Sequence, residues 1–276
     1  MKKIFIGIAA GSCLLMSLKV KTQTSNDFDK KFRFGLRVTP QPTWFKAGNG
    51  DKNNVPIGAN FGFGFGLNME FKLSDIAAIL TGIGGDFEGG KYKVKYDPAG
   101  NYEVIYWLDE NSELVTPKGG TRKNYTAYVL KERQVKSTFV TLPAILKLST
   151  KEYGGFKYFG MFGGELAYRA KTLANETYYE LRKYTTDSTF TASAPTGRND
   201  GISINKDASL VPFRIGFNVG GGAEYRLGGS TSLFGSINFF TGLTNFMKKE
   251  SDYMYYNGPK KDGDKDGVAD HYDKCP

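Results

Sequence analysis

The residues best suited to chemistry are five aspartates near the end of the 276-residue chain. They stand at positions 1, 3, 5, 9 and 12 of one loop: Asp262, Asp264, Asp266, Asp270 and Asp273. Gly267 at position 6 permits the turn, and the backbone carbonyl of Val268 at position 7 adds an oxygen. Ca²⁺ prefers such an oxygen cage. The spacing therefore predicts a Ca²⁺ site, although no helices flank it as in an EF-hand, and the alternative is a merely acidic linker.

Other chemistry finds little support in the sequence. His271 is the only histidine and lies in the same tail, which argues against Ser-His catalysis. Gly62, Gly64 and Gly66 repeat every two residues inside a strand pattern, so they do not form a nucleotide-binding loop. We therefore expect no enzyme, no catalytic residues and no cofactor besides Ca²⁺.

The most regular element in the chain is Ile57–Leu73, where apolar residues alternate with Gly, Asn and charged residues over 17 positions. A period of two indicates a strand, because a helix repeats its apolar residues at three and four. One face carries large apolar side chains and the other mostly Gly and Asn. Lipid outside a narrow barrel explains this pattern, and so does a long strand of a soluble sandwich.

Six other stretches alternate in a similar way and decide between these two folds. The predicted strands are Phe32–Trp44, Ile57–Leu73, Ala77–Tyr96, Gln134–Ser149, Phe156–Lys171, Ser209–Leu227 and Thr231–Phe246. Connections are long after the first, third and fifth strands and short after the second, fourth and sixth. Outer-membrane barrels have this asymmetry, with short periplasmic turns and long outer loops. The predicted fold class is therefore all-β, a small antiparallel transmembrane β-barrel of about eight strands over residues 32–258.

The eighth strand is the weak point of this prediction, because barrels of this class have an even number of strands. Ser251–Asn257 is short and lacks a clear alternation. Either it is the eighth strand in poor form, or that strand lies past Pro276.

The N-terminus predicts export. Met1–Lys3 is basic, Ile4–Leu18 is apolar, and the chain turns polar by Gln23, as in a signal peptide over residues 1–23. Lipid attachment at Cys13 is the alternative. The formal charge of +9 falls to +5 when the four lysines of this segment are removed, which does not indicate a nucleic-acid partner. We expect the protein in the cell outer membrane, in contact with lipid.

Charged residues of both signs fall on the inward faces of the predicted strands. They are Arg33, Arg37, Glu70, Lys72, Asp86, Glu88, Lys147, Glu165, Arg169, Arg214, Glu224 and Arg226. A barrel of about eight strands has room inside only for side chains, so we expect these charges to pair and fill the lumen. A buried carboxylate such as Glu224 is expected to pair with Arg214 or Arg226. A proton or ion path along the lumen is the alternative.

Two resemblances add expectations. Residues 32–246 resemble the PorT-like outer-membrane β-barrel family of Bacteroidota through Gly35–Pro40 (GLRVTP), Thr138–Lys147 (TFVTLPAILK) and Gly220–Tyr225 (GGGAEY). Residues 259–276 resemble the start of a thrombospondin type 3 repeat, which implies a partner past Pro276 for Cys275. In outer-membrane protein A-like proteins such repeats lead to a periplasmic peptidoglycan-binding domain.

These observations predict a non-enzymatic barrel with a structural, assembly or interaction role, whose loops or tail bind protein or peptidoglycan. The alternative is a narrow pore for small solutes. The Tyr-rich connections Asp97–Lys131 and Thr172–Asp207 are interpreted as strand extensions or a contact surface. The resemblance favours a periplasmic Ca²⁺ loop, whereas an eighth strand past Pro276 would place that loop outside the cell.

Overall fold

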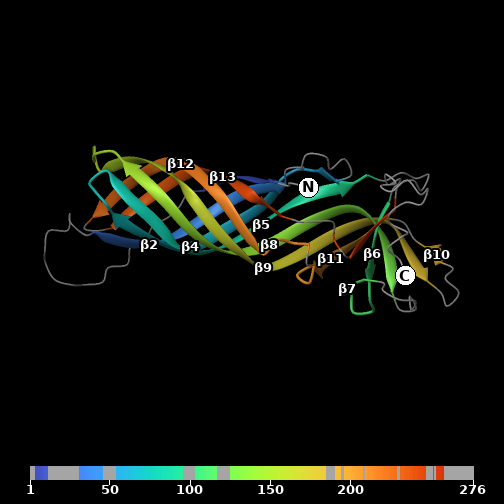
Figure 1. The fold of residues 1–276 in the computed structure, drawn as a ribbon. Coiled ribbons are helices and arrows are strands. Elements are labelled where there is room, and N and C mark those ends of the chain that lie inside the picture. The colour runs from blue at the N-terminus through green and yellow to red at the C-terminus, as the bar shows by residue number, and fades with distance from the viewer. Residues whose placement is uncertain are drawn as a thin grey trace, which may run out of the picture.

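The computed structural model describes residues 4–11, 31–45, 54–95, 103–116, 125–184, 190–193, 196–207, 209–228, 231–246, 251 and 253–257. Within these ranges the fold is all-β and every strand pairing is antiparallel (Figure 1). None of the described residues belongs to a helix that is long and apolar enough to cross a membrane.

The described strands form one sheet. They are β1 (Ile4–Gly11), β2 (Phe32–Phe45), β3 (Asn54–Pro56), β4 (Asn60–Lys72), β5 (Ala77–Val94), β6 (Glu103–Leu108), β7 (Leu114–Val115), β8 (Thr126–Ser149), β9 (Phe156–Tyr184), β10 (Phe190–Ser193), β11 (Gly197–Ser203), β12 (Phe213–Gly228), β13 (Thr231–Asn245) and β14 (Met254–Asn257).

The long strands pair in a sequence that returns to its start. From β9 the pairings run through β12, β13, β1, β2, β4, β5 and β8, and β8 pairs with β9. The sheet is curled into a barrel-like form, with its short turns at one end (Figure 1). The all-β antiparallel part of the prediction is confirmed.

All seven predicted strands are present, but two of them are longer than expected. β8 begins at Thr126, and β9 continues to Tyr184 and has 29 residues. A tilted strand needs only about 9–11 residues to cross a bilayer. The Tyr-rich connections therefore contain strand extensions, as predicted: Tyr106 lies in β6, and Tyr178 lies in β9.

The eighth position of the sheet is filled by an unexpected segment. β1 pairs with β13 on one side and β2 on the other, although Ile4–Gly11 belongs to the predicted signal peptide. The candidate eighth strand Ser251–Asn257 does not take this position. Its strand part, β14, pairs with β6 instead. The signal peptide itself stays a prediction, and residues 258–276 lie outside the described ranges.

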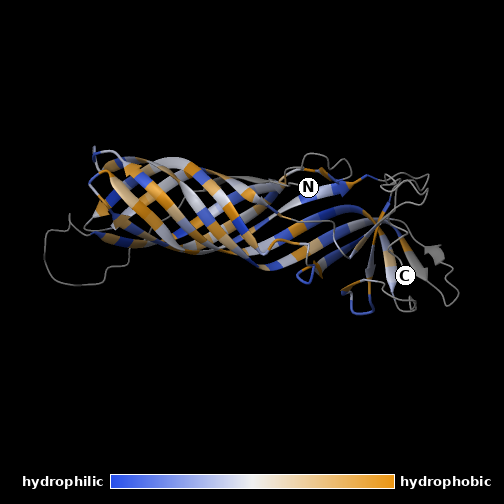
Figure 2. Ribbon diagram, viewed as in Figure 1, coloured by the Kyte–Doolittle hydropathy of each residue, from blue (hydrophilic) through white to orange (hydrophobic). Residues whose placement is uncertain are grey.

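The part of the curled sheet nearest the short turns has its apolar side chains on the outside. We call this surface the apolar belt, and its exposed members include Phe34, Leu36, Phe63, Phe65, Ile83, Val140, Leu142, Phe162, Leu166, Phe217, Val219, Ile237, Phe239 and Leu243. Their neighbours along each strand point inward, which gives the alternating bands of Figure 2. The period of two in the sequence therefore separates an outward apolar face from an inward polar face.

The other part reverses this arrangement. We call it the distal extension: residues 126–137 of β8 and 172–184 of β9, together with β6, β7, β10, β11 and β14. Its apolar side chains are buried in two clusters, which include Val104, Tyr106, Leu130, Val135, Ala174, Ile202, Ile105, Trp107, Ala127 and Val129. Ile204 and Leu210, which follow β11, complete the larger cluster on this side. Tyr106 is fully buried and stacks on Tyr128, with 5.2 Å between ring centres.

Candidate functional site: the buried ion-pair network

Charged side chains gather on the inward face of the curled sheet. Seven of them are buried, with exposed fractions of 8% or less: Glu70, Asp86, Glu88, Lys147, Glu165, Arg214 and Glu224. Alternation along each strand places these side chains on the inner face of the sheet, whereas their neighbours in the apolar belt lie on the outer face. They form two groups, one around Arg214 and one around Lys147.

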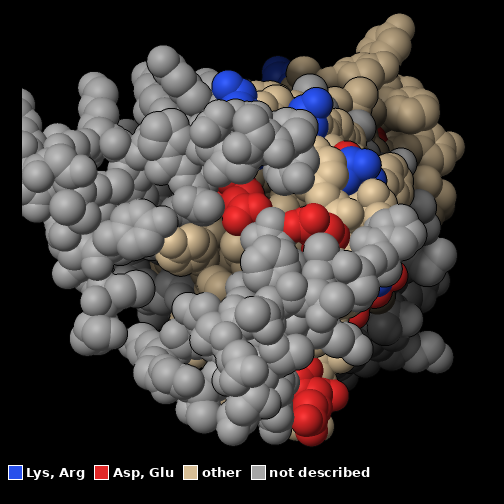
Figure 3. Space-filling model, turned by 90° about the vertical axis from the view of Figure 1, so that its right-hand side faces the viewer, with Lys and Arg blue, Asp and Glu red and all other residues tan. Residues whose placement is uncertain are grey.

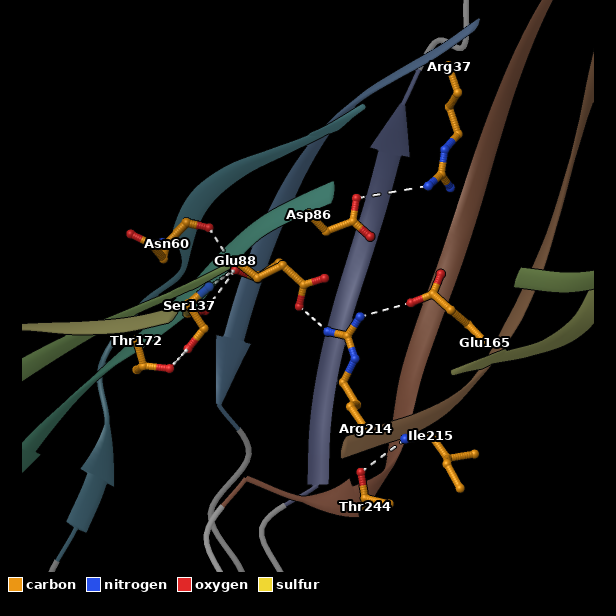
Figure 4. A network of polar contacts seen from close by, with 12 residues as sticks. Arg37, Asn60, Asp86, Glu88, Ser137, Glu165, Thr172, Arg214, Ile215 and Thr244 are labelled. Carbon is orange, nitrogen blue, oxygen red and sulfur yellow. Dashed lines mark hydrogen bonds and ion pairs between the residues drawn. The ribbon is translucent and has the colours of Figure 1, made fainter. Parts of the chain in front are cut away.

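Arg214 of β12 lies at the centre of the first group (Figure 4). Its Nη2 donates to Oε1 of Glu165 on β9 at 2.9 Å, and its Nη1 donates to Glu88 on β5. The guanidinium carbon lies 4.5 Å from the ring centre of Phe139 and 4.6 Å from that of Phe240. A planar guanidinium stacks on aromatic faces while its edge bonds carboxylates. One arginine thus links side chains of β5, β8, β9, β12 and β13.

Arg37 and Asp86 extend this group toward β2. Arg37 Nη2 lies 4.0 Å from Asp86 Oδ1. Two glycines make room for the pair: a Cβ at Gly64 would lie 1.9 Å from Asp86 Oδ1, and a Cβ at Gly84 would lie 2.9 Å from Arg37 Nη2. At Gly64 and Gly84, the charged side chains packed against the strand therefore require a residue without a side chain.

Lys147 of β8 holds the second group together near the short turns. Its Nζ donates to Glu70 Oε2 at 2.8 Å and to Glu224 Oε2 at 2.9 Å, and it lies 4.8 Å from the ring centre of Phe159. Glu224 Oε1 also accepts from Arg33 at 2.8 Å and from Ser232 at 2.6 Å. Each carboxylate is thus held by at least one cation, which offsets much of the cost of burying charge.

An apolar layer packs beside the second group. Its residues are Leu80, Ile145, Phe159, Met161 and Phe234. On β8, Ile145 stands between Phe139 of the first group and Lys147 of the second, and on β9, Met161 precedes Glu165. The interior is therefore filled by ion pairs and by apolar side chains packed beside them.

One predicted pairing is wrong. Glu224 was expected to face Arg214 or Arg226, but its cations are Lys147 and Arg33, and Arg214 pairs with Glu88 and Glu165. Alternation along a strand gives the face on which a residue lies. The partner depends on which strands meet across the interior, and one sequence does not show this.

A further buried ion pair, separate from these two groups, lies in the distal extension. Arg133 pairs with Glu176, whose side chain is fully buried. Burial raises the pKa of the Glu176 carboxyl above its ordinary value, and Arg133 opposes that rise. Nearby, the Tyr106 hydroxyl accepts a hydrogen bond from Asn199 Nδ2 at 3.0 Å. Burial raises the pKa of Tyr106 strongly, and the negative charge of Glu176 adds to this. This polar site therefore favours a neutral tyrosine.

The predicted Ca²⁺ ligands and His271 all lie outside the described residues. Among the residues that the structure does describe, no group of three or more His, Cys, Asp or Glu is arranged to hold a metal ion. The network contains five carboxylates and four cations, so most of its charge is neutralised by pairing within it. The ion pairs join side chains of different strands across the interior.

Sequence reasoning placed most of the charges but missed their aromatic and distal partners. Phe139 shares its face with Ser137 and Thr141, so the alternation of β8 could have placed it inside. Phe240 could have been found in the same way on β13. Arg133, Glu176 and Tyr106 gave no such signal, because they lie in segments that read as connections.

Comparisons with known proteins identified no relative of this chain. No protein-family model, no curated protein and no solved structure matches the chain. The two resemblances seen in the sequence therefore stay predictions.

Proposed function

We propose that this chain is a small transmembrane β-barrel of the bacterial outer membrane, closed by about eight strands, with a filled and charge-paired interior. One observation carries the proposal: the apolar belt is exposed outside, and the ion pairs are buried inside. Soluble monomers rarely expose contiguous apolar patches larger than a few hundred Å². Lipid is the surrounding that makes such a belt favourable.

The connections support an orientation in that membrane. Short links join β4 to β5, β8 to β9 and β12 to β13, and all of them lie at the end opposite the distal extension. Outer-membrane barrels have short turns on the periplasmic side and long loops outside. The distal extension therefore projects toward the medium in this proposal.

Closure of the mature barrel needs a strand between β13 and β2. β1 fills this position, antiparallel to both neighbours. If export removes residues 1–23, another strand must replace it, because an open sheet edge in lipid leaves backbone groups unsatisfied at several kcal/mol each.

The filled interior favours a structural, assembly or interaction role over catalysis. Partners would then be bound by the distal extension or the tail. The resemblance to PorT-like barrels and type 3 repeats suggests a protein or peptidoglycan partner and a Ca²⁺ loop at Asp262–Asp273. These identities are proposed from the resemblance and the motif alone.

Conductance in planar lipid bilayers tests the filled interior. The purified protein, with insertion checked by flotation with lipid vesicles, is expected to give no steady channels, because two ion-paired groups and an apolar layer occupy the lumen. Steady single-channel currents from the inserted protein would contradict a filled lumen and support the alternative, a narrow pore for small solutes.

A further inference from the structure

Four lysines lie together on the outer face of β5, β8 and β9, at the distal edge of the apolar belt. They are Lys91, Lys93, Lys136 and Lys171, and we call this surface the basic rim. Lys93, Lys136 and Lys171 are exposed, and Lys91 is half-buried. Within the part of the chain that the structure describes, none of the four forms an ion pair. Their charges are therefore available to a partner.

The sheet register places these lysines directly beside the belt. Val140 pairs with Tyr168 as the last exposed apolar row of β8 and β9, and Lys171 follows opposite Thr138. Lys136 lies one row further out, opposite Gly89 of β5. The change from apolar to cationic surface thus occurs within three residues on β9, from Tyr168 to Lys171, and within four on β8, from Val140 to Lys136. In a membrane this is the depth at which lipid headgroups begin.

A polar hollow adjoins the lysines. It has a volume of about 380 Å³, with the open space at its mouth included, and Lys91, Gln134, Asn175, Thr177 and Arg198 contribute to its lining. Cross-strand pairing sets Lys91, Gln134 and Asn175 in one row. Amide and hydroxyl side chains of this kind bond sugar hydroxyls, since they both donate and accept.

Acidic residues nearby lower the positive charge around the basic rim without cancelling it. Glu132 lies opposite Lys93, and Asp200 bonds Arg198 at 2.6 Å. Figure 3 views the distal end, where basic side chains lie along the upper edge and acidic ones lie near the middle and at the lower edge. The lysines closest to the belt, Lys136 and Lys171, have uncharged cross-strand partners.

We propose that the basic rim binds the phosphorylated sugar headgroup of a lipid in the leaflet around the distal side of the belt. The inference rests on the proposed membrane function. The lysines would hold phosphate, the polar hollow would hold sugar hydroxyls, and the belt below would contact the acyl chains. A basic residue near an anionic membrane surface strengthens binding by about fivefold. Free phosphate would meet only the first of these three features.

The test uses the full chain in neutral detergent micelles and a diphosphorylated disaccharide lipid, with its dephosphorylated form for comparison. Native mass spectrometry gives the dissociation constant of each lipid. The wild type is expected to prefer the phosphorylated lipid, and K136Q/K171Q to lose about 25-fold in affinity for it. K31Q/K151Q removes the same charge from exposed positions at the short-turn end and is expected to change nothing.

Two results would overturn the basic rim. One is equal affinity of the wild type for both lipids, or for inorganic phosphate and the phosphorylated lipid. The other is equal weakening by the rim and control variants. Flotation with lipid vesicles tests the membrane proposal separately, so a protein that floats yet fails to distinguish the lipids refutes the rim alone.

Discussion

Strand β8 runs through two regions: in one its apolar side chains are exposed on the outer face, and in the other they are buried. In the apolar belt, Val140 and Leu142 are 42% and 53% exposed, and Lys147 is buried. In the distal extension, Val135 is 1% exposed and Lys136 is exposed. Both regions lie on one continuous strand. The two regions therefore differ because their surroundings differ, and each face of the strand carries side chains that suit the groups in contact with it.

The comparison separates two ways of stabilising a β-sheet. The distal extension is built like a soluble protein, in which burial of apolar area is the main favourable term. In the proposed membrane, the belt region would gain little free energy from moving apolar groups from lipid to the interior, and its inside holds ion pairs and packed rings. A buried charge should then matter most in the belt region, and a buried hydroxyl or ring most in the extension.

The largest expected effect comes from removing the central cation of the belt region. Arg214→Leu leaves Glu88 and Glu165 buried without their shared partner, and should lower the free energy of unfolding by about 3–5 kcal/mol. Urea titration in lipid vesicles measures it. The matched control is Arg198→Leu in the distal extension, whose pair with Asp200 is exposed and should be worth less than about 1 kcal/mol. Equal losses would remove the distinction between the regions.

A smaller effect is expected from filling the space beside Asp86. Gly64→Ala places a methyl group where the Asp86 carboxylate lies, and the displaced pair should cost about 1–3 kcal/mol. Gly235→Ala is the control, because a Cβ there meets nothing within 4 Å. The same titration should show a change within about 0.5 kcal/mol for the control. A harmless Gly64→Ala would mean that the inward glycines are not required by the charges.

The smallest effect concerns the hydroxyl of Tyr106 in the distal extension. Tyr106→Phe loses the bond from Asn199 and should cost about 1 kcal/mol at neutral pH. Because the folded pKa lies above the unfolded value of about 10, this group's contribution is complete below that pH and is lost as pH rises above it. Absorbance titration should show a late-ionising tyrosine fraction that Tyr106→Phe reduces. Ionisation of all tyrosines together near pH 10 would contradict the buried site.

Sequence alone predicted the belt region well because its signal is local. A period of two depends only on which face of the strand is apolar, so Phe63 and Phe65 are predicted to point outward and Glu70 inward without knowledge of any partner strand. The partner of Glu224 was not predicted, because it depends on how β8 and β12 meet across the interior. The sequence of one strand does not show which distant strand lies across the interior from it.

The distal extension was harder to predict for a different reason. Register shifts between Tyr128 and Leu130 and between Leu130 and Glu132 break the alternation of β8 there. Its strands are also short, as in β14, which pairs with β6. The position of Ile4–Gly11 in the sheet had no signal either, because its composition also fits a signal peptide.

The most direct test of the central claim, that the belt faces lipid, is a depth series along β12. Val219 lies in the middle of the belt, between Phe162 and Phe239, and Leu227 lies at its short-turn edge; they are 46% and 59% exposed. The free energy of unfolding in lipid vesicles should fall by about 2–4 kcal/mol for Val219→Lys and by about 0–1 kcal/mol for Leu227→Lys. A water-exposed face would tolerate both substitutions within about 0.5 kcal/mol, and that result would contradict the membrane barrel.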